Sequence, residues 1–298
     1  MAGEPQATFD DRDGWIWFDG DLVPWRDAKI HVLTHALHYA SSVFEGQRAY
    51  NGSVFKLREH TERLHQSARI LGFDIPWTFD EIDAACNAVL KANGYTDAYM
   101  RPVAWRGAES MGVAPGTTKP HLAIAAWDWG KYYDPRESEN GIRLDIADWR
   151  RPAPYTAPTA SKASGLYMIC TLSKQRAEER GFNDALMFDW RGQVAEATGA
   201  NVFFVADGTL HTPTPDCFLD GITRRTIMDL ARNRGIEVVE RAIWPEELES
   251  FEQMFLTGTA VEVTPVRSAG PWNFAVGDLT RQLSKDYDDL VCGRIPNA

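Results

Sequence analysis

The alternation of apolar and polar residues near the start of the chain predicts two β-hairpins. Each hairpin centres on a dipeptide that favours a tight turn, Asp19-Gly20 in the first and Asn51-Gly52 in the second. Runs rich in aromatic and β-branched residues flank these turns and span residues 15–18, 21–25, 43–50 and 53–57. We therefore expect short antiparallel strand pairs in this region.

Two helices are predicted after the second hairpin. Apolar residues at positions i, i+4 and i+7 indicate a helix over residues 58–72. A second helix begins after Thr78, because Thr78 and Glu81 have the spacing of a capping box, and it ends at Asn93-Gly94. Residues 31–42, between the hairpins, fit either a short helix or an irregular segment, and their pattern does not decide between the two.

A change of composition follows two further strand patterns, at residues 97–105 and 121–127. Residues 128–141 are polar and charged, contain proline and glycine, and fit neither a helix nor a strand pattern. We therefore place an interdomain loop over residues 128–141.

The second half of the chain mixes strand and helix patterns. Strand patterns cover residues 142–148, 184–189, 201–207, 236–242, 253–258 and 260–266. Helices are expected over residues 166–181, from Ile222, from Pro245 and at the C-terminus. This mixture predicts an α/β fold of the α+β type, with a smaller N-terminal domain (1–127), a larger C-terminal domain (142–298) and a cleft between them.

The composition is typical of a soluble globular chain and argues against nucleic acid as a partner. The 298 residues are 44% apolar and 24% charged, and their formal net charge of −11 would repel nucleic acid and anionic membranes. The four cysteines are scattered without a C-x-x-C pair, which is typical of reduced thiols. No signal peptide and no apolar stretch that could span a bilayer are visible. These features predict a cytoplasmic protein.

Several common sites are not indicated. The sequence lacks the glycine-rich dinucleotide and P-loop signatures, the H-E-x-x-H pair of zinc proteases and the G-x-S-x-G nucleophile turn. His31, His35 and His38 would share one face of a helix, a spacing that suits a metal if a carboxylate joined them. No fourth ligand stands nearby, so we expect no metal site and favour hydrogen-bonded histidines.

Two ionisable residues stand among small neighbours. Lys162 lies in the segment PTASKASG, where small side chains leave room for a flat ring, and a partly buried lysine is a suitable Schiff-base nucleophile. Glu196 lies in VAEATG, where a carboxylate needs a basic partner such as a pyridine nitrogen unless it faces solvent. By themselves, both residues fit a solvated surface better than a functional site.

Two segments could hold a phosphate group. Gly221-Ile222-Thr223 opens a predicted helix, where free N–H groups and the helix dipole attract anions. Thr257-Gly258-Thr259 follows a predicted strand and offers hydroxyl groups and a close backbone approach. Arg58, at the start of the first long helix, could add a positive charge. Each signal alone is more typical of a turn or of an exposed side chain than of a phosphate site.

Taken together, these segments resemble the fold type IV pyridoxal-phosphate enzymes, and most closely the branched-chain amino acid aminotransferases. The resemblance covers nearly the whole chain and rests on several motifs in a fixed order. They are residues 16–39, SVFEGQRAY, the REH of residues 58–60, AYMRP, MGVAP, PTASKASGLY, VAEATG, GITRR and LTGTAVEVTPVRS.

The resemblance implies a two-domain fold type IV aminotransferase with pyridoxal 5′-phosphate in the cleft. Lys162 matches the lysine that binds the cofactor covalently and later moves the proton. Tyr167 matches the tyrosine beside the ring hydroxyl, and Glu196 matches the carboxylate that keeps the pyridine nitrogen protonated. Four residues match the phosphate cradle, namely Arg58, Ile222, Thr223 and Thr259.

The resemblance also implies how the substrates bind. Tyr99, Thr259 and Ala260 match the clamp on the substrate α-carboxylate. Tyr39 and Arg101 match the residues that receive the second carboxylate of glutamate. One pocket would then accept both a leucine-like chain and a glutamate carboxylate, because Arg101 can pair with the acid at the rim of an apolar wall.

Phe44 and Gly46 match the walls of the side-chain pocket, but other positions depart from the family pattern. Gln47 follows FEG where an aliphatic residue is usual, Ala200 stands where many members have a second glutamate, and Asp220 replaces the proline before GIT. Further departures are Ser164 at a common glycine, and Trp127 and Trp129 on either side of Asp128. These positions leave the substrate range open.

The leading hypothesis is transfer of an amino group between L-branched-chain amino acids (leucine, isoleucine and valine) and 2-oxoglutarate in two alternating half-reactions. A first alternative within the same fold is an (R)-amine or D-amino acid aminotransferase, although Arg101 and Tyr39 argue against it. Aminodeoxychorismate lyase activity and a non-catalytic cofactor-binding protein are further alternatives. The resemblance also implies at least a homodimer, in which a loop of one subunit reaches the site of its neighbour.

Overall fold

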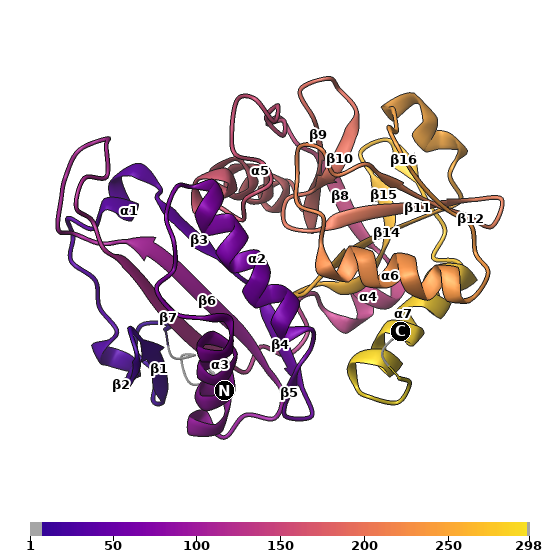
Figure 1. The fold of residues 1–298 in the computed structure, drawn as a ribbon. Coiled ribbons are helices and arrows are strands. Elements are labelled where there is room, and N and C mark those ends of the chain that lie inside the picture. Colours follow the sequence, from indigo (N-terminus) through magenta and orange to yellow (C-terminus); the bar gives the residue numbers. More distant parts are fainter. Residues whose placement is uncertain (1–7, 297–298) are drawn as a thin grey trace, which may run out of the picture. The chain divides into compact units, whose positions relative to one another are not determined.

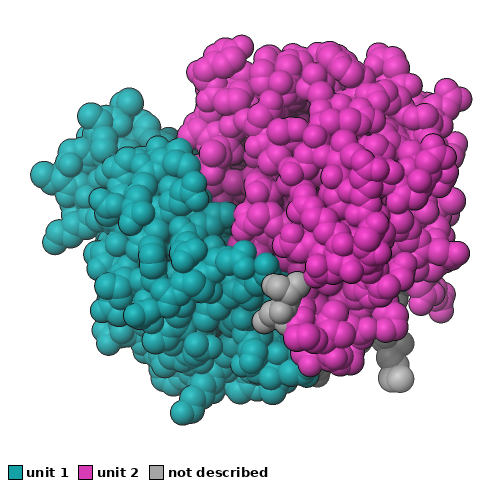
Figure 2. All heavy atoms as spheres, turned by 45° about the vertical axis from the view of Figure 1, so that its right-hand side comes forward, with its two compact units in different colours: residues 1–129 teal, residues 130–298 magenta. Residues whose placement is uncertain are grey.

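The computed structural model describes residues 8–296, and the chain divides into two compact units, Met1–Trp129 and Gly130–Ala298 (Figure 2). The division falls between Trp129 and Gly130, inside the segment that the sequence proposes as an interdomain loop. Each unit mixes helices with one main sheet, which confirms the predicted α/β class.

Unit 1 contains one antiparallel sheet with the strand order β2-β1-β7-β6-β4-β5, and β3 also pairs with β6 (Figure 1). Its strands are β1 (Trp15–Phe18), β2 (Asp21–Pro24), β3 (Ser42–Phe44), β4 (Gln47–Tyr50), β5 (Ser53–Val54), β6 (Ala98–Arg106) and β7 (Pro120–Trp127). Both predicted hairpins are present, as β1–β2 and β4–β5.

The helices of unit 1 are α1 (His35–Tyr39), α2 (Leu57–Ile70) and α3 (Phe79–Asn93), with a 3-10 turn at Trp25–Asp27. The predicted capping box is confirmed, because the Thr78 hydroxyl accepts from Glu81 N and the Glu81 carboxylate accepts from Thr78 N. The segment that the sequence left open contains α1 and then β3. Helices α2 and α3 bury their apolar residues, including Leu64 and Ile82, in one core with the sheet.

Unit 2 contains a mixed sheet with the strand order β10-β9-β8-β15-β14-β11-β12-β13, and β16 pairs with β15. Its strands are β8 (Ile142–Ile146), β9 (Asp184–Phe188), β10 (Val194–Ala197), β11 (Asn201–Ala206), β12 (Thr209–Pro213), β13 (Val238–Arg241), β14 (Gln253–Gly258), β15 (Glu262–Ala269) and β16 (Trp272–Asn273). The pairs β8–β9, β8–β15 and β12–β13 are parallel, and the others are antiparallel.

The helices of unit 2 are α4 (Pro135–Asn140), α5 (Met168–Glu179), α6 (Ile222–Asn233) and α7 (Asp278–Val291), with 3-10 turns η2 (Ser164–Tyr167) and η3 (Pro245–Ser250). Helix α6 packs against β14, and α7 packs against β14 and β15, whereas α5 packs against β8 and β9 (Figure 1).

Three features correct the expectations from sequence. The segment 128–141 was expected to lack helix, but it contains α4, which begins with Asp134 as N-cap and a proline in the first turn. Strands β10 and β12 were not predicted as strands, because each is short and shows no clear alternation of apolar and polar residues. Among the described residues, no helix is long and apolar enough to cross a membrane.

Candidate active site

Lys162 lies two residues before the 3-10 turn η2, which brings the lysine and Tyr167 together. The Lys162 Nζ donates a hydrogen bond to the Tyr167 hydroxyl at 3.0 Å. The lysine side chain is half-buried, and its neighbours Ser161 and Ala163 are buried. The Lys162 side chain thus lies in a half-buried place beside the Tyr167 hydroxyl, and not on the fully solvated surface that the sequence alone also allows.

Glu196 lies on β10 and is buried beside two polar partners. Its Oε1 lies 3.2 Å from Arg151 Nε in an ion pair, and its Oε2 accepts from Asn201 Nδ2 at 3.3 Å. Burial raises the pKa of Glu196 above its ordinary value, and the charges of Arg151 and Lys162 oppose that rise. The Glu196 carboxylate therefore binds a proton more readily than an ordinary glutamate does, and its charge interacts with that of Lys162.

The N-terminus of α6 is the first of the two predicted anion sites. Gly221 is the N-cap and supplies no side-chain hydrogen bond, while Ile222 and Thr223 are buried in the first turn. A Cβ at Gly221 would lie 2.2 Å from Asn201 Oδ1, so glycine is required for this close approach. Asn201 Nδ2 also donates to Leu219 O at 3.0 Å and links the start of α6 to Glu196.

Arg224 fixes the position of α6. Its guanidinium is almost completely buried and contacts Asp220 Oδ1 at 2.8 Å and Glu240 Oε2 at 2.6 Å. It also donates to Thr212 Oγ1 and Pro213 O on β12. Asp220, which departs from the family pattern, thus supplies a counter-charge for a buried arginine.

The second predicted anion site lies at the end of β14. Thr257 pairs with Asn201 across β14 and β11, and its Oγ1 is buried without a hydrogen-bond partner among the described residues. The turn after Gly258 leads through Thr259 and Ala260, both half-buried, to the first residue of β15. An unpaired buried hydroxyl indicates a place for a polar ligand.

These groups of unit 2 suit one kind of ligand. They offer an amine at Lys162, a buried carboxylate at Glu196, uncapped helix N–H groups and an unpaired hydroxyl at Thr257. A molecule with a carbonyl group, a basic ring nitrogen and a phosphate would satisfy all of them. Pyridoxal 5′-phosphate has these three features.

In unit 1, four of the predicted substrate residues lie together. Arg101 and Tyr99 are two residues apart on β6, and Arg101 donates to the Tyr99 hydroxyl at 3.0 Å. The Arg101 guanidinium carbon lies 4.7 Å from the centre of the Phe44 ring. A Cβ at Gly46 would lie 2.2 Å from the Tyr99 hydroxyl oxygen, so this glycine allows the tyrosine its place.

Aromatic side chains surround Tyr99. Its ring centre lies 4.3 Å from that of Trp129 and 5.2 Å from that of Trp127. Two buried polar atoms here, Arg101 Nε and Trp127 Nε1, have no hydrogen-bond partner in the described part of the chain. The two tryptophans that the sequence marked as departures therefore contribute to the wall around a predicted substrate residue.

Tyr39 and Arg58 do not lie in this cluster. Tyr39 ends α1 with its side chain 41% exposed. Arg58, at the start of α2, forms ion pairs with Asp80 at 2.5 Å and with Asp83 at 2.8 Å, and these pairs raise its pKa, with the Asp80 hydrogen bond as the largest cause. The structure thus pairs the predicted phosphate ligand Arg58 with two carboxylates of its own unit.

Sequence reasoning missed the roles of Arg151, Asn201 and Arg224. No local pattern marks them, because each is defined by burial and by partners distant along the chain.

The structure also shows the surroundings of two residues that depart from the family pattern, Gln47 and Ala200. Gln47 is buried and accepts a hydrogen bond from the Cys86 thiol, and Ala200 packs in the core of unit 2.

The three spaced histidines form hydrogen bonds with protein groups. His31 precedes α1 and accepts from Leu33 N. His35 contacts Ser41 Oγ at 2.6 Å and Gly112 O at 2.9 Å, and His38 contacts Val32 O at 2.9 Å. They do not share a helix face, because α1 begins only at His35.

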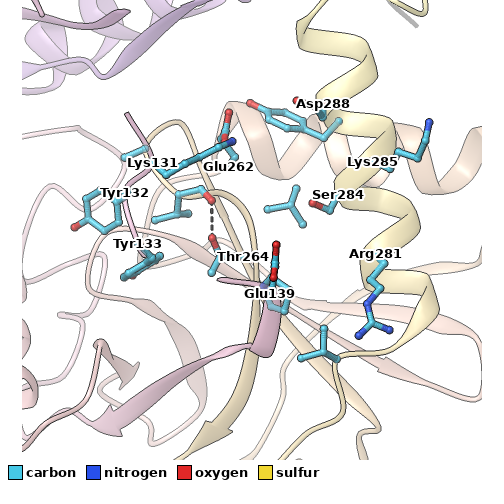
Figure 3. Close-up of a pocket in the computed structure, with 16 residues that line it drawn as sticks. Lys131, Tyr132, Tyr133, Glu139, Glu262, Thr264, Arg281, Ser284, Lys285 and Asp288 are labelled. Carbon is cyan, nitrogen blue, oxygen red and sulfur yellow. Dashed lines mark hydrogen bonds and ion pairs between the residues drawn. The ribbon is translucent and has the colours of Figure 1, made fainter. Parts of the chain in front are cut away.

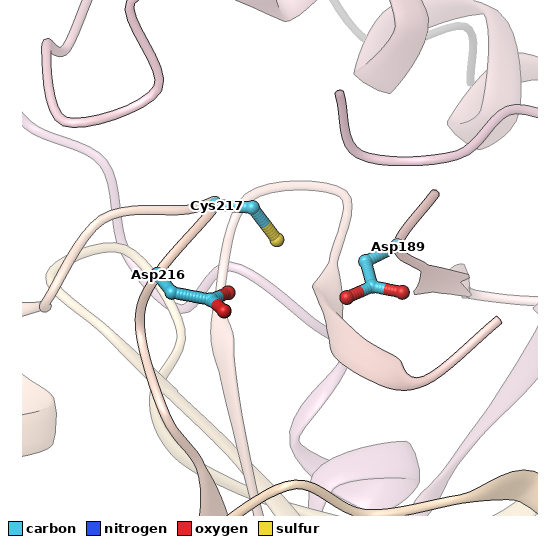
Figure 4. Close-up of side chains that lie close together, drawn as sticks. All are labelled: Asp189, Asp216 and Cys217. Atoms are coloured by element: carbon cyan, nitrogen blue, oxygen red, sulfur yellow. The ribbon is translucent and has the colours of Figure 1, made fainter. Parts of the chain in front are cut away.

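A different cluster, Asp189, Asp216 and Cys217, brings three possible metal ligands together (Figure 4). One nitrogen of Arg191 lies 2.6 Å from Asp189 and 2.7 Å from Asp216. Asp189 also accepts from the backbone N–H groups of Arg191 and Gln193. This cluster is thus an ion-pair network around an arginine.

A pocket of about 680 Å³ lies within unit 2, between α7 and the start of β15 (Figure 3). It includes Ala260, but Lys162 and Glu196 do not line it. Several of its charged residues form ion pairs, as in the Lys131–Glu262 contact at 2.9 Å. The pocket is distinct from the cluster around Lys162.

Comparison with known proteins identifies the family. Residues 42–269 match the family model described as amino-transferase class IV, and the chain belongs to this family. Relatives named branched-chain-amino-acid aminotransferase are 42% identical over 291 residues in Pseudomonas aeruginosa and 43% identical over 288 residues in Escherichia coli K12. These matches cover 95% of both chains in the first case, and 94% of this chain and 93% of the relative in the second. The predicted family and enzyme class are confirmed.

Solved structures agree. The branched-chain amino acid aminotransferase of T.th. with pyridoxamine 5′-phosphate has a TM-score of 0.92 and 37% identity, over 96% of each chain. The same enzyme complexed with N-(5′-phosphopyridoxyl)-L-glutamate has a TM-score of 0.91 and 36% identity, again over 96% of each chain. A third structure of it, with 4-methylvaleric acid, has a TM-score of 0.89 and 36% identity over 96% of each chain. The predicted fold is confirmed.

Proposed function

We propose that this chain transfers the amino group between L-branched-chain amino acids and 2-oxoglutarate, with pyridoxal 5′-phosphate bound to Lys162. The observation that carries the proposal is the Lys162 amine held 3.0 Å from the Tyr167 hydroxyl, in the same unit as a buried and basic Glu196. The motifs that hold these residues match a family of which one branched-chain amino acid aminotransferase was solved with pyridoxamine 5′-phosphate.

The residues of unit 2 divide the binding of the cofactor among them. Glu196 would hold the ring nitrogen, because a buried carboxylate with a raised pKa is a strong acceptor for an N–H group. Ile222 and Thr223 would bind the phosphate through the first turn of α6, and Thr259 would add a hydroxyl. When bound, pyridoxal phosphate supplies the electron sink that makes the substrate α-hydrogen acidic.

Lys162 and Tyr167 would handle the proton. With the cofactor bound, the Lys162 amine would act as the base that takes a proton from the substrate α-carbon. Tyr167 keeps this amine in place by accepting its hydrogen bond, and it lies five residues away across the short η2 turn. A rigid turn holds the amine better than a free lysine chain would, because fewer rotamers must be lost.

The residues of unit 1 would select the substrate. Tyr99, with the backbone at Thr259 and Ala260 in unit 2, would bind the α-carboxylate. Arg101 lies over the Phe44 ring, so one face is apolar while the guanidinium offers a charge. This combination suits both a branched aliphatic chain and the second carboxylate of glutamate, to which Tyr39 would add its hydroxyl.

We also propose a homodimer. An exposed apolar patch in unit 1 consists of Ile30, Val32, Leu33, Leu37, Tyr39, Met111 and Val113. Val113 is 82% exposed and Val32 is 70% exposed, and His35 joins the two segments of the patch through its contact with Gly112 O. Such a patch favours a protein partner, and a second copy would also bring Tyr39 to a neighbouring site.

The thiols of Cys86, Cys170 and Cys217 are buried and form no disulfide, in keeping with a cytoplasmic location.

The test is the absorbance spectrum of the purified protein loaded with pyridoxal phosphate. Adding L-leucine should remove the band of the lysine-bound cofactor, and borohydride reduction before this step should attach the cofactor to the peptide that contains Lys162. A spectral response to (R)-1-phenylethylamine or D-alanine without one to L-leucine would replace the proposal with the amine or D-amino acid alternative. A protein that never forms the lysine-bound band would contradict the proposal.

A further inference from the structure

Glu45 is a buried carboxylate of unit 1 that has no part in the proposed chemistry. It lies between Phe44 and Gly46, two residues of the proposed side-chain pocket, and its side chain is fully buried. A buried carboxylate without a counter-charge would be strongly destabilising, so its partners define what it does.

Two residues of α2 bind this carboxylate. Arg63 donates from Nε to Oε1 at 2.7 Å and from a second nitrogen to Oε2 at 2.8 Å, which is the paired geometry of a strong arginine–carboxylate contact. His60 Nδ1 lies 2.7 Å from the same Oε2. Burial alone would raise the pKa of Glu45, but the Arg63 charge and the hydrogen bonds from Arg63 and His60 hold it well below its usual range.

The backbone at Glu45 is a point where the sheet would otherwise be weak. Strand β3 pairs with β6 up to Phe44 and β4 resumes pairing at Gln47, so Glu45 and Gly46 lie opposite the segment that contains Pro102. Proline has no N–H to donate, and Glu45 N bonds to Pro102 O at 2.8 Å. The Glu45 side chain adds a second attachment at this gap, on the side of α2.

Because side chains alternate along an extended segment, Phe44 and Gly46 face the opposite side from Glu45. On that side, Gly46 borders the Tyr99 hydroxyl so closely that a Cβ would lie 2.2 Å from it. The Phe44 ring lies under the Arg101 guanidinium, 4.7 Å from its central carbon. The ion pair on one face and the pocket wall on the other therefore share three consecutive residues.

We propose that Glu45 is a positioning residue that determines substrate specificity: its ion pair with Arg63 and His60 fixes the Phe44–Gly46 wall and thereby the place of the Arg101 guanidinium. This inference rests on the proposed function, which assigns Arg101 to the second carboxylate of glutamate. An apolar side chain tolerates a small displacement of the wall, because dispersion contacts have little directional preference. A carboxylate needs a guanidinium in a defined position, so recognition of the dicarboxylate should depend more strongly on Glu45.

The test compares the binding of two unreactive acids to the loaded enzyme, glutarate for the dicarboxylate and 4-methylvaleric acid for the apolar chain. Glu45→Gln removes the negative charge with little change of shape and leaves the identity of every pocket residue unchanged. We expect glutarate to bind about tenfold more weakly, and 4-methylvaleric acid to lose about threefold or less. The ratio of kcat/KM for L-glutamate and L-leucine should shift in the same direction.

Asp19→Asn is the matched control. Asp19 lies in unit 1, where its carboxylate contacts His121 Nδ1 at 2.6 Å and accepts from Leu122 N at 2.9 Å. A general loosening of unit 1 should affect both variants and both acids alike. If Glu45→Gln keeps the wild-type ratio of the two dissociation constants, or shifts it no more than Asp19→Asn does, the proposal is wrong.

Arg63→Lys provides a second variant should Glu45→Gln not fold. Lysine keeps the positive charge but cannot form the two parallel bonds to Glu45, so the ratio should move in the same direction by a smaller factor. An unchanged ratio in this variant would also overturn the proposal. Failure of the proposed function would appear separately, as a wild-type enzyme that does not react with L-leucine, and the acid-binding ratio would still be measurable.

Discussion

Arg151 and Glu196 form a buried ion pair in unit 2, with the Arg151 Nε and a Glu196 carboxylate oxygen 3.2 Å apart. Only 4% of Arg151 and 8% of Glu196 are exposed to solvent. A charged partner this close keeps a buried carboxylate ionised, although burial still holds its pKa above the ordinary value. The pair therefore controls how basic the proposed partner of the cofactor ring is.

Glu196→Gln should lower the rate of the half-reaction more than it lowers cofactor affinity. Glutamine keeps the shape of the side chain but cannot carry the negative charge that stabilises a protonated ring nitrogen. We expect kcat to fall by about a hundredfold or more, with less than about a tenfold change in cofactor dissociation. Stopped-flow absorbance with L-leucine and equilibrium dialysis would measure the two effects, and a variant with near wild-type kcat would contradict the role of Glu196.

Arg151→Met should move the acid limb of the pH–rate profile to higher pH. Removal of the guanidinium takes away the largest influence that lowers the Glu196 pKa, so that pKa should rise further. Glu196 must be ionised to act. On acidification, the variant should therefore begin to lose activity at a higher pH than the wild type does. The profile of kcat between pH 5 and 9 tests this, and Arg150→Met, at the exposed neighbouring position, serves as control.

Glu45 should make the stability of the protein depend on pH below the ordinary glutamate range. Its pKa in the folded state lies well below the usual value, so its contribution is complete above about pH 4.5 and is lost as the pH falls toward the folded-state pKa. The difference in unfolding free energy between wild type and Glu45→Gln should therefore shrink with acidification. Urea denaturation at several pH values from 7 to 3 would measure it; a constant difference would contradict the assignment.

Arg224→Met should destabilise unit 2 strongly. It removes a buried cation together with its hydrogen bonds to Thr212 Oγ1 and Pro213 O, and leaves the half-exposed carboxylates of Asp220 and Glu240 without this counter-charge, at a cost of about 1–3 kcal/mol. Arg225→Met is the control, because Arg225 is 40% exposed and its ion pair with Asp220 is longer, at 3.4 Å, so the change should stay within about 1 kcal/mol. Denaturant unfolding measures both, and equal effects would show that burial of Arg224 is unimportant.

Val113→Asp should weaken the proposed homodimer. Val113 is exposed within the apolar patch, and a charge there would have to be buried when two copies meet. Sedimentation should give a smaller species than wild type at micromolar concentration, with reduced activity. Ile70→Asp, which replaces an exposed apolar residue on α2 outside the patch, should leave the assembly unchanged. A monomeric wild type would contradict the dimer itself.

The elements that sequence predicted best are those with local signals. Helix α3 begins and ends where Thr78, Glu81 and Gly94 require, because capping depends on neighbours three or four residues away. Strand β10 was missed, since its four buried residues pair with β9 and give no alternation of their own. Helix α4 was missed because it has only six residues and lacks apolar periodicity, which outweighed the start signal of Asp134 followed by proline.

The candidate site shows the same limit. Lys162 and Glu196 could be singled out because small neighbours surround them in the sequence. Arg151 could not, since its partner lies 45 positions further along the chain and only the fold brings them to 3.2 Å. Motifs at fixed spacing identified the family, whereas buried polar partners became visible only in the folded chain.

The proposed cofactor residues, apart from Arg58, belong to unit 2, whereas the cluster of Phe44, Gly46, Tyr99 and Arg101 belongs to unit 1. Each unit has its own hydrophobic core and its own sheet. Substitutions that alter the preference for a donor can therefore accumulate in one segment of the gene without weakening retention of the coenzyme. Diversification in evolution, or a mutant library in the laboratory, could explore new amines by changing residues of the first 129 other than Arg58.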